Sequence, residues 1–290
     1  MKILITGANG MLAKEVREKF TEGNELTLTD VKDLDITNEK NVFEFITNLK
    51  PEWIINCAAF TAVDKAEECY DLADKINGDG PTNLAKAAKA AGSKLVHIST
   101  DYVFGGDLSL DKDYKEDDPK KPVTVYGKTK LHGEEGITKN LDEYYIFRTA
   151  WLYGIGGNNF VKTMTKLGTT HDEINVVCDQ HGSPTYAKDL TEIIYQAINK
   201  KIPFGIYNAT NEGYTTWYDF TKEILAEQNI KCKVNPVTTE QYIEMMKVTQ
   251  AKRPYNSQMS KEKLKSVGIN VPEWKDGLKR YLEEAKQNEE

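Results

Sequence analysis

The chain has 290 residues, a formal net charge of −7 and a mean hydropathy of −0.57, and 29% of its residues are charged. This length is enough for one large α/β domain, or for a large domain with a smaller one appended. The acidic balance, without a basic stripe of interleaved aromatic residues, argues against nucleic acid as a partner. No apolar run approaches the roughly 18 residues of a membrane span, and no signal peptide pattern precedes the first strand. We therefore expect a cytoplasmic protein with no membrane partner.

The four cysteines show neither C-x-x-C spacing nor a metal-binding arrangement with histidine. A structural zinc site or a disulfide framework is therefore not expected. Cysteines of this kind usually pack as small hydrophobic residues. They are Cys57, Cys69, Cys178 and Cys232.

The N-terminus predicts a dinucleotide-binding loop. A short β-branched run at residues 2–6 is followed by a glycine turn and then by a helix to about Phe20. Gly7 permits the tight turn, and Gly10 lets the backbone approach a pyrophosphate at the positive end of the helix dipole. Ala13 is a small third residue that allows close helix packing. We assign to the cofactor Gly7, Gly10, Met11 and Leu12.

Asp30 ends the second predicted strand, 23 residues after Gly7. A carboxylate at this point can accept a hydrogen bond from the adenosine ribose and would repel a 2′-phosphate. The cofactor is therefore NADH or NADPH, and Asp30 predicts that NADH is used well. The alternative is an ordinary aspartate that caps a turn at a strand end.

Tyr126 and Lys130 are four residues apart in a stretch of helix formers, so their side chains share one helix face. A nearby cation favours the phenolate and lowers the pKa of a tyrosine from about 10. Thr100 follows the predicted strand at residues 94–99, and ligands bind outside the carboxyl ends of parallel strands. These three residues are our candidate catalytic set. Taken alone, the tyrosine and lysine also fit a surface lysine beside a half-buried tyrosine.

The alternation of strands and helices predicts an α/β fold, a Rossmann-type doubly wound parallel sheet with a smaller C-terminal α/β substrate-binding domain. We expect the dinucleotide-binding domain at residues 1–150 plus about 173–209. The substrate domain would take about 151–172 plus 210–290. The polar stretch at residues 105–125 is expected to be a mobile loop over the site or a merely solvated loop.

The chain resembles the extended short-chain dehydrogenases/reductases over nearly its whole length, and within them the branch that reduces dTDP-4-dehydro sugars. The resemblance is carried by the glycine loop and by six further motifs. These are N-C-A-A-F-T-A-V-D at Asn56–Asp64, S-T-D-Y-V-F at Ser99–Phe104, V-Y-G-K-T-K at Val125–Lys130, R-T-A-W-L-Y-G at Arg148–Gly154, D-Q-H-G-S-P-T at Asp179–Thr185 and R-P-Y-N-S-Q-M at Arg253–Met259.

The resemblance implies reduction of the C4 ketone of dTDP-4-dehydro-β-L-rhamnose, with Thr100, Tyr126 and Lys130 as the catalytic triad. Tyr126 would give its proton to the developing alkoxide, Thr100 would hydrogen-bond the same oxygen, and Lys130 would bind the cofactor ribose and lower the tyrosine pKa. Further cofactor contacts implied by the resemblance are Asp35, Ile36, Ala58, Ala59 and Phe60. The substrate-binding residues expected besides Thr100 are Asp101, Trp151, Asn159 and Arg253, the last as a planar partner for the diphosphate.

Three alternatives are weighed against the reductase. In related 4,6-dehydratases a glutamate removes the C5 proton, but Tyr102 stands at that place, which disfavours dehydration. An epimerase uses the same triad with a retained NAD and is harder to exclude. A non-catalytic NADP-binding subunit, similar to the regulatory β subunit of methionine adenosyltransferase, would share the fold.

The resemblance leaves metal binding and oligomeric state open. Some family members bind Mg²⁺ through carboxylates at a dimer interface, and Glu15 matches one of them. Where another carboxylate is expected, after Pro184-Thr185, this chain has Lys188. We therefore assign no metal ligands, and both Mg²⁺ binding and a homodimer remain open.

Overall fold

The computed structural model describes residues 1–247 and 250–287. The strands are β1 (Lys2–Thr6), β2 (Glu25–Thr29), β3 (Trp53–Asn56), β4 (Lys94–Thr100), β5 (Tyr144–Thr149), β6 (Leu152–Tyr153), β7 (Glu173–Val177), β8 (His181–Gly182), β9 (Thr185–Tyr186), β10 (Gly205–Asn208), β11 (Thr215–Thr216) and β12 (Lys233–Val237). The helices are α1 (Met11–Thr21), α2 (Glu39–Leu49), α3 (Val63–Ala66), α4 (Tyr70–Asp74), α5 (Gly80–Ala91), α6 (Val125–Asn140), α7 (Phe160–Thr170), α8 (Ala187–Lys200), α9 (Trp217–Glu227), α10 (Thr239–Met246), α11 (Glu262–Ser266) and α12 (Trp274–Gln287). Within the described ranges, no helix is long and apolar enough to cross a membrane.

Six strands form one parallel sheet in the order β10-β5-β4-β3-β1-β2. The sequence order reverses between β1 and β3, because β2 lies on one side of β1 and all later strands of the sheet lie on the other. In open parallel sheets the ligand crevice lies at such a switch point, outside the carboxyl ends of the strands. The expected Rossmann-type doubly wound sheet is confirmed.

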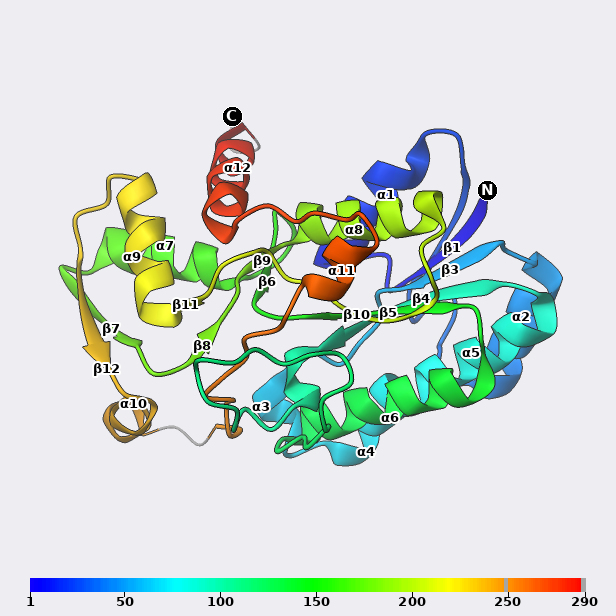
Figure 1. The fold of residues 1–290 in the computed structure, drawn as a ribbon, viewed down its shortest axis with the longest axis horizontal. Coiled ribbons are helices and arrows are strands. Elements are labelled where there is room, and N and C mark those ends of the chain that lie inside the picture. Colours follow the sequence, from blue (N-terminus) through cyan, green and yellow to red (C-terminus); the bar gives the residue numbers. More distant parts are fainter. Residues whose placement is uncertain (248–249, 288–290) are drawn as a thin grey trace.

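Helices cover both faces of this sheet, as Figure 1 shows. On one face α1 and α8 pack against inward side chains such as Ile3, Ile5 and Phe147. On the other, α2, α5 and α6 cover Leu4, Ile54 and related residues. Alternate residues of β1 therefore enter opposite cores, as the two-residue period of a strand requires.

A smaller unit lies at the far side of Figure 1 from the N-terminus and contains α7, α9, β7, β12 and part of α12. Its core is aromatic, with Tyr153, Phe220 and Trp274 in contact through edge and tilted ring pairs. Strand β7 pairs in parallel with β12 and buries Ile174 and Val176 in this core. The sequence analysis assigned residues from about 173 to the larger domain, whereas β7 packs in the core of the smaller unit.

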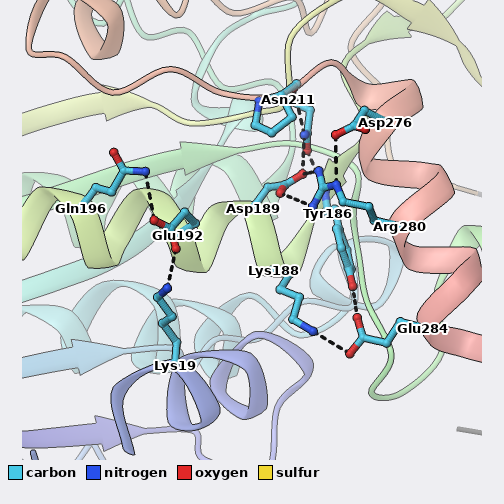
Figure 2. A network of polar contacts seen from close by, with 11 residues as sticks. Lys19, Tyr186, Lys188, Asp189, Glu192, Gln196, Asn211, Asp276, Arg280 and Glu284 are labelled. Atoms are coloured by element: carbon cyan, nitrogen blue, oxygen red, sulfur yellow. Dashed lines mark hydrogen bonds and ion pairs between the residues drawn. The ribbon is translucent and has the colours of Figure 1, made fainter. Parts of the chain in front are cut away.

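Figure 2 shows the polar network that joins α8 of the larger unit to α12. Arg280 donates two hydrogen bonds of 2.8 Å to the buried carboxylate of Asp189, which also accepts one of 2.6 Å from Asn211. A bidentate pair of this kind fixes orientation as well as distance. The two helices are therefore held in one arrangement.

The segment between β4 and α6 has no regular structure after the turn at residues 101–103, but it is anchored. Tyr114 is buried, stacks on Phe104 with ring centroids 4.4 Å apart, and exchanges backbone hydrogen bonds with the segment around Gln258. The Glu116 carbonyl accepts a hydrogen bond from Arg148 of β5. The interpretation as a merely solvated loop is therefore wrong.

Candidate active site

The turn after β1 brings backbone against backbone. Gly7 has φ +66°, and a Cβ placed there would lie 2.7 Å from the Ala58 backbone, so only glycine fits. Asp30 lies beside this turn, where its carboxylate accepts a hydrogen bond from the Asn9 amide. The loop that follows β1 and the end of β2 thus form one wall of the crevice.

A cavity of about 380 Å³ begins at this wall. It brings together most of the residues that the sequence assigned to the adenosine half of the cofactor. Its lining includes Gly7, Gly10, Asp30, Asp35, Ile36, Ala58 and Ala59. Phe60 lies outside this lining, and its backbone is bound on both sides by the Asn77 side chain.

A second cavity of about 480 Å³ continues from the first, since both are lined by Gly10, Ala58 and Ala59. Met11 and Leu12 also line it, and its far part reaches Thr100, Tyr126 and Lys130. The two cavities together make an elongated crevice from an acidic strand end to the candidate triad. A dinucleotide fits this shape, with its pyrophosphate at the start of α1.

Two local features place Tyr126 in the crevice. Thr124 caps α6 by accepting a hydrogen bond from the Gly127 amide, as N-cap threonines do. A Cβ at Gly127 would lie 2.2 Å from the Tyr102 carbonyl, so this glycine allows the helix to pack closely on the turn after β4. The Tyr102 and Tyr126 rings are 5.5 Å apart, edge to face.

Burial, and then the charge of Asp101, raise the pKa of Tyr126 above its usual value, and a hydrogen bond with Thr100 partly offsets this. Thr100 in turn donates a hydrogen bond of 2.9 Å to Asp101. A tyrosine with a raised pKa keeps its proton at neutral pH, so it is suited to donate a proton.

The expected lowering of the Tyr126 pKa by Lys130 is not what the structure shows. The Lys130 ammonium donates a hydrogen bond of 2.6 Å to the Ile98 carbonyl and lies 3.2 Å from Nε2 of His97. Burial also lowers the pKa of Lys130 to about 8. Lys130 is therefore directed to the end of β4, and burial dominates the pKa of the tyrosine.

A third cavity, of about 330 Å³, adjoins the second, because Tyr102 and Trp151 line both. Trp151 has φ +50°, a strained backbone for a large side chain, and stacks on Trp217 at 3.6 Å. Strain of this kind is common at functional sites. The indole pair forms a flat apolar wall where the two units meet.

Arg253 lies on the same cavity and is held from two sides. It donates hydrogen bonds of 3.1 Å to the Tyr102 hydroxyl and 2.7 Å to Asp64. A guanidinium fixed in this way is a ready partner for phosphate oxygens. Trp151, Asp101 and Arg253 thus line the connected second and third cavities, as the sequence analysis expected of substrate-binding residues.

Asn159 does not join them. Its side chain caps α7 by accepting from the Lys162 amide, and it donates to the Gly154 carbonyl. Asparagine is a preferred N-cap residue, and this local role uses both ends of its amide. Asn158 lines the second cavity instead.

Several residues of the third cavity were missed from the sequence. Gln180 accepts a hydrogen bond from the Trp217 indole, and Ser257 binds Asp101. Gln180 and Ser257 belong to motifs that the sequence analysis singled out without assigning them a role. Tyr242 comes from α10, which carries no comparable motif.

Glu15 lies near an ion pair between Lys188 and Glu284. Lys188 binds Glu284 at 2.9 Å, and burial followed by the charge of Glu284 raises the pKa of Glu15. Over residues 1–247 and 250–287, no group of three or more histidine, cysteine, aspartate and glutamate residues is arranged to hold a metal ion.

A crevice with room for a dinucleotide that ends at a half-buried tyrosine with a raised pKa is the site of a nicotinamide-dependent oxidoreductase. The sheet that carries this crevice is of the Rossmann type. Residues 1–287 match the model described as RmlD substrate binding domain, and the chain belongs to that family.

Individual relatives agree with this assignment. The chain is 40% identical to the spore coat polysaccharide biosynthesis protein SpsK of Bacillus subtilis, over 98% of this chain and 97% of the relative. A crystal structure of a dTDP-4-dehydrorhamnose reductase from Clostridium acetobutylicum is 48% identical, with a TM-score of 0.94 and coverage of 99% and 100%. The enzyme of that name from Bacillus anthracis, solved in complex with NADP, is 42% identical, with a TM-score of 0.92 and coverage of 98% and 100%.

Proposed function

We propose that the chain reduces the C4 ketone of dTDP-4-dehydro-β-L-rhamnose to dTDP-L-rhamnose, the last step in making this nucleotide sugar. It is an oxidoreductase that uses a nicotinamide cofactor. One observation carries the proposal: a dinucleotide-sized crevice that reaches Thr100 and Tyr126 adjoins a second ligand cavity, because Tyr102 and Trp151 line both. The Clostridium acetobutylicum and Bacillus anthracis relatives, both named dTDP-4-dehydrorhamnose reductase, support this substrate.

The residues of the chain have distinct roles in this proposal. The bound cofactor supplies the hydride. Tyr126 holds a proton at its phenol oxygen and gives it to the alkoxide that develops at C4, and the Thr100 hydroxyl stabilises the same oxygen. Lys130 binds the cofactor ribose beside the tyrosine. Trp151 lies against the sugar, and Arg253 binds the diphosphate.

The environment of Tyr102 separates this proposal from elimination chemistry. Burial raises its pKa to about 12, and its hydroxyl is bound by Arg253. A phenol in that state does not remove a carbon-bound proton at neutral pH. Reduction needs no base at this position. An epimerase remains the second candidate because it would use the same triad, but it would not consume the cofactor.

The choice between NADH and NADPH follows from Asp30. Its carboxylate lies in the adenosine cavity, where it would repel a 2′-phosphate and bind a ribose diol. We propose good use of NADH, although the Bacillus anthracis relative was solved with NADP. In this proposal the sheet of the larger unit binds the cofactor, and the smaller unit binds the nucleotide sugar.

The test uses dTDP-4-dehydro-β-L-rhamnose, generated in place by the upstream enzymes, as the substrate. Oxidation of NADH, and separately of NADPH, is monitored by the loss of cofactor absorbance. The proposal predicts sugar-dependent oxidation and one equivalent of dTDP-L-rhamnose per cofactor oxidised. Conversion of the sugar without net oxidation would indicate an epimerase. Cofactor binding without any conversion would indicate the non-catalytic subunit.

A further inference from the structure

A chain of buried side chains connects the first strand of the sheet to Lys130. Thr6 Oγ1 donates a hydrogen bond of 2.7 Å to Oδ1 of Asn56. Nδ2 of Asn56 lies 3.0 Å from Nδ1 of His97, and Nε2 of His97 lies 3.2 Å from Nζ of Lys130. All four residues are at most 1% exposed, and Lys130 also lines the second cavity.

The orientation of the Asn56 amide is determined by the backbone. The amide N–H of Ala58 lies 3.1 Å from Oδ1 of Asn56, and a backbone N–H can only donate. Oδ1 is therefore the acceptor on that side, and Nδ2 faces the histidine. An amide flip would place two donors against each other at Ala58.

This orientation selects the tautomer of His97. The Asn56 Nδ2 group donates, so Nδ1 of His97 must be the acceptor and carries no proton. A neutral imidazole has one N–H, which is then on Nε2 and faces Lys130. Burial, and then Lys130, lower the pKa of His97 well below its usual value, which is consistent with a neutral ring.

The Nε2–H group changes what Lys130 can satisfy. A neutral amine accepts this hydrogen with its lone pair while it donates to the Ile98 carbonyl at 2.6 Å. An ammonium keeps the bond to Ile98 but points a second N–H at the N–H of the histidine. Only the neutral amine satisfies both of these neighbours.

We propose that His97 is a positioning residue that, in the tautomer selected by Asn56, presents an N–H to Lys130 and so makes this lysine release its proton more readily. The inference rests on the proposed role of Lys130 beside Tyr126. The inference explains why Lys130 can exchange a proton near neutral pH in the free protein. It also identifies His97 as the residue whose substitution should change the pKa of Lys130.

The charged groups around Lys130 support this assignment. On its own helix, Glu134 raises the pKa of Lys130, but it is already paired with Arg148 of β5 at 2.7 Å. From β4, His97 is the titratable residue in contact with Lys130, and Tyr126 lies one turn away on α6. Burial lowers the pKa of Lys130 to about 8.

The first test measures the tautomer directly. The chain has 4 histidines, so ¹⁵N-histidine NMR of the free protein can resolve them, and His97→Gln identifies the His97 signals by their loss. We expect Nε2 to be protonated and Nδ1 to be bare, with no titration in the range where exposed histidines titrate. Protonation on Nδ1 would overturn the proposal, whatever the enzyme's activity or substrate.

The second test moves the proton affinity of Lys130. The side-chain oxygen of His97→Gln can accept from an ammonium, so ε-¹³C-lysine NMR should show the pKa of Lys130 raised by about one unit. The signal is assigned by its loss in Lys130→Met. Thr6→Val is the matched control, because Ala58 alone still orients Asn56, and we expect it to leave the Lys130 titration in place.

The third readout is the pH profile of the enzyme. If the reductase activity is established, the alkaline limb of kcat/KM should move upward in His97→Gln by the same amount as the NMR titration. An unchanged Lys130 titration in a folded His97→Gln protein would contradict the inference. Failure of the proposed substrate, with the tautomer and titration as expected, would leave this inference intact and overturn only the function.

Discussion

Ser257 donates a hydrogen bond of 2.5 Å to the buried carboxylate of Asp101, across 156 positions of sequence. Asp101 also accepts from Thr100, so one carboxylate connects the segment after α10 to a candidate catalytic hydroxyl. Burial raises the pKa of Asp101 to about 6, and the hydrogen bonds from Ser257 and Thr100 limit the rise. A charge is therefore kept at the junction of the two cavities at neutral pH.

This raised pKa predicts a pH-dependent stability. The pKa of Asp101 is higher in the folded chain than its value of 3.8 when unfolded, so the native state binds the proton more tightly and loses stability as pH rises through about 6. Asp101→Asn removes the titration. The free energy of unfolding of Asp101→Asn, minus that of the parent protein, should therefore rise by on the order of 1 kcal/mol between pH 5 and 7.

The measurement is urea denaturation of both proteins at the two pH values. Asp142→Asn, at an exposed position after α6, removes the same charge without a buried site and should show no such trend. If the difference in free energy of unfolding between Asp101→Asn and the parent stays constant or falls as pH rises, the pKa of Asp101 is not raised in the native state.

The buried pair of Arg148 and Glu134 predicts a large loss of stability. The guanidinium binds both carboxylate oxygens, at 2.9 and 2.7 Å, and Ser99 donates to the same carboxylate. Glu134→Ala leaves the arginine charge buried without a partner, which costs about 3–5 kcal/mol. Glu135→Ala, on the exposed side of the same helix, should change the free energy of unfolding little. The free energies of unfolding are measured by chemical denaturation. Equal losses in Glu134→Ala and Glu135→Ala would contradict the predicted importance of the buried pair.

Asp30 predicts cofactor preference. Asp30→Ala removes the carboxylate that faces the adenosine cavity, so the ratio of kcat/KM for NADPH to that for NADH should rise about tenfold or more, the effect of roughly one unfavourable charge contact. The rates with the two cofactors are measured at fixed sugar concentration. Asp142→Asn serves again as the control for net charge. A ratio that stays the same in Asp30→Ala would exclude Asp30 as the selective group.

Local spacing explains what the sequence could predict. The glycine turn after β1 and the Tyr126–Lys130 pair each lie within one strand–turn–helix or one helix, where geometry follows from periodicity. The place of Thr100 followed from a general rule on strand ends. The glycine turn, the Tyr126–Lys130 pair and Thr100 all line the crevice.

Long-range pairing explains what the sequence could not predict. β7 is a five-residue strand with no local signal for the sheet it joins, and its partner β12 lies beyond two further helices. Trp217 meets Trp151 only because the smaller unit folds back on the crevice. The contacts of Lys130 with His97 and the Ile98 carbonyl could not be foreseen, because these partners come from another element. Asn159 was assigned to substrate although its own helix needs it as a cap.

Tyr126→Phe tests the central claim most directly, with turnover and cofactor binding measured on the same preparation. If Tyr126 is the proton donor, sugar-dependent oxidation of the cofactor should fall by about 10²–10⁴-fold. The affinity for NADH or NADPH, measured by fluorescence titration, should stay nearly unchanged. Turnover that survives the change within a few fold would contradict the account, because Tyr126 would then not be the proton donor.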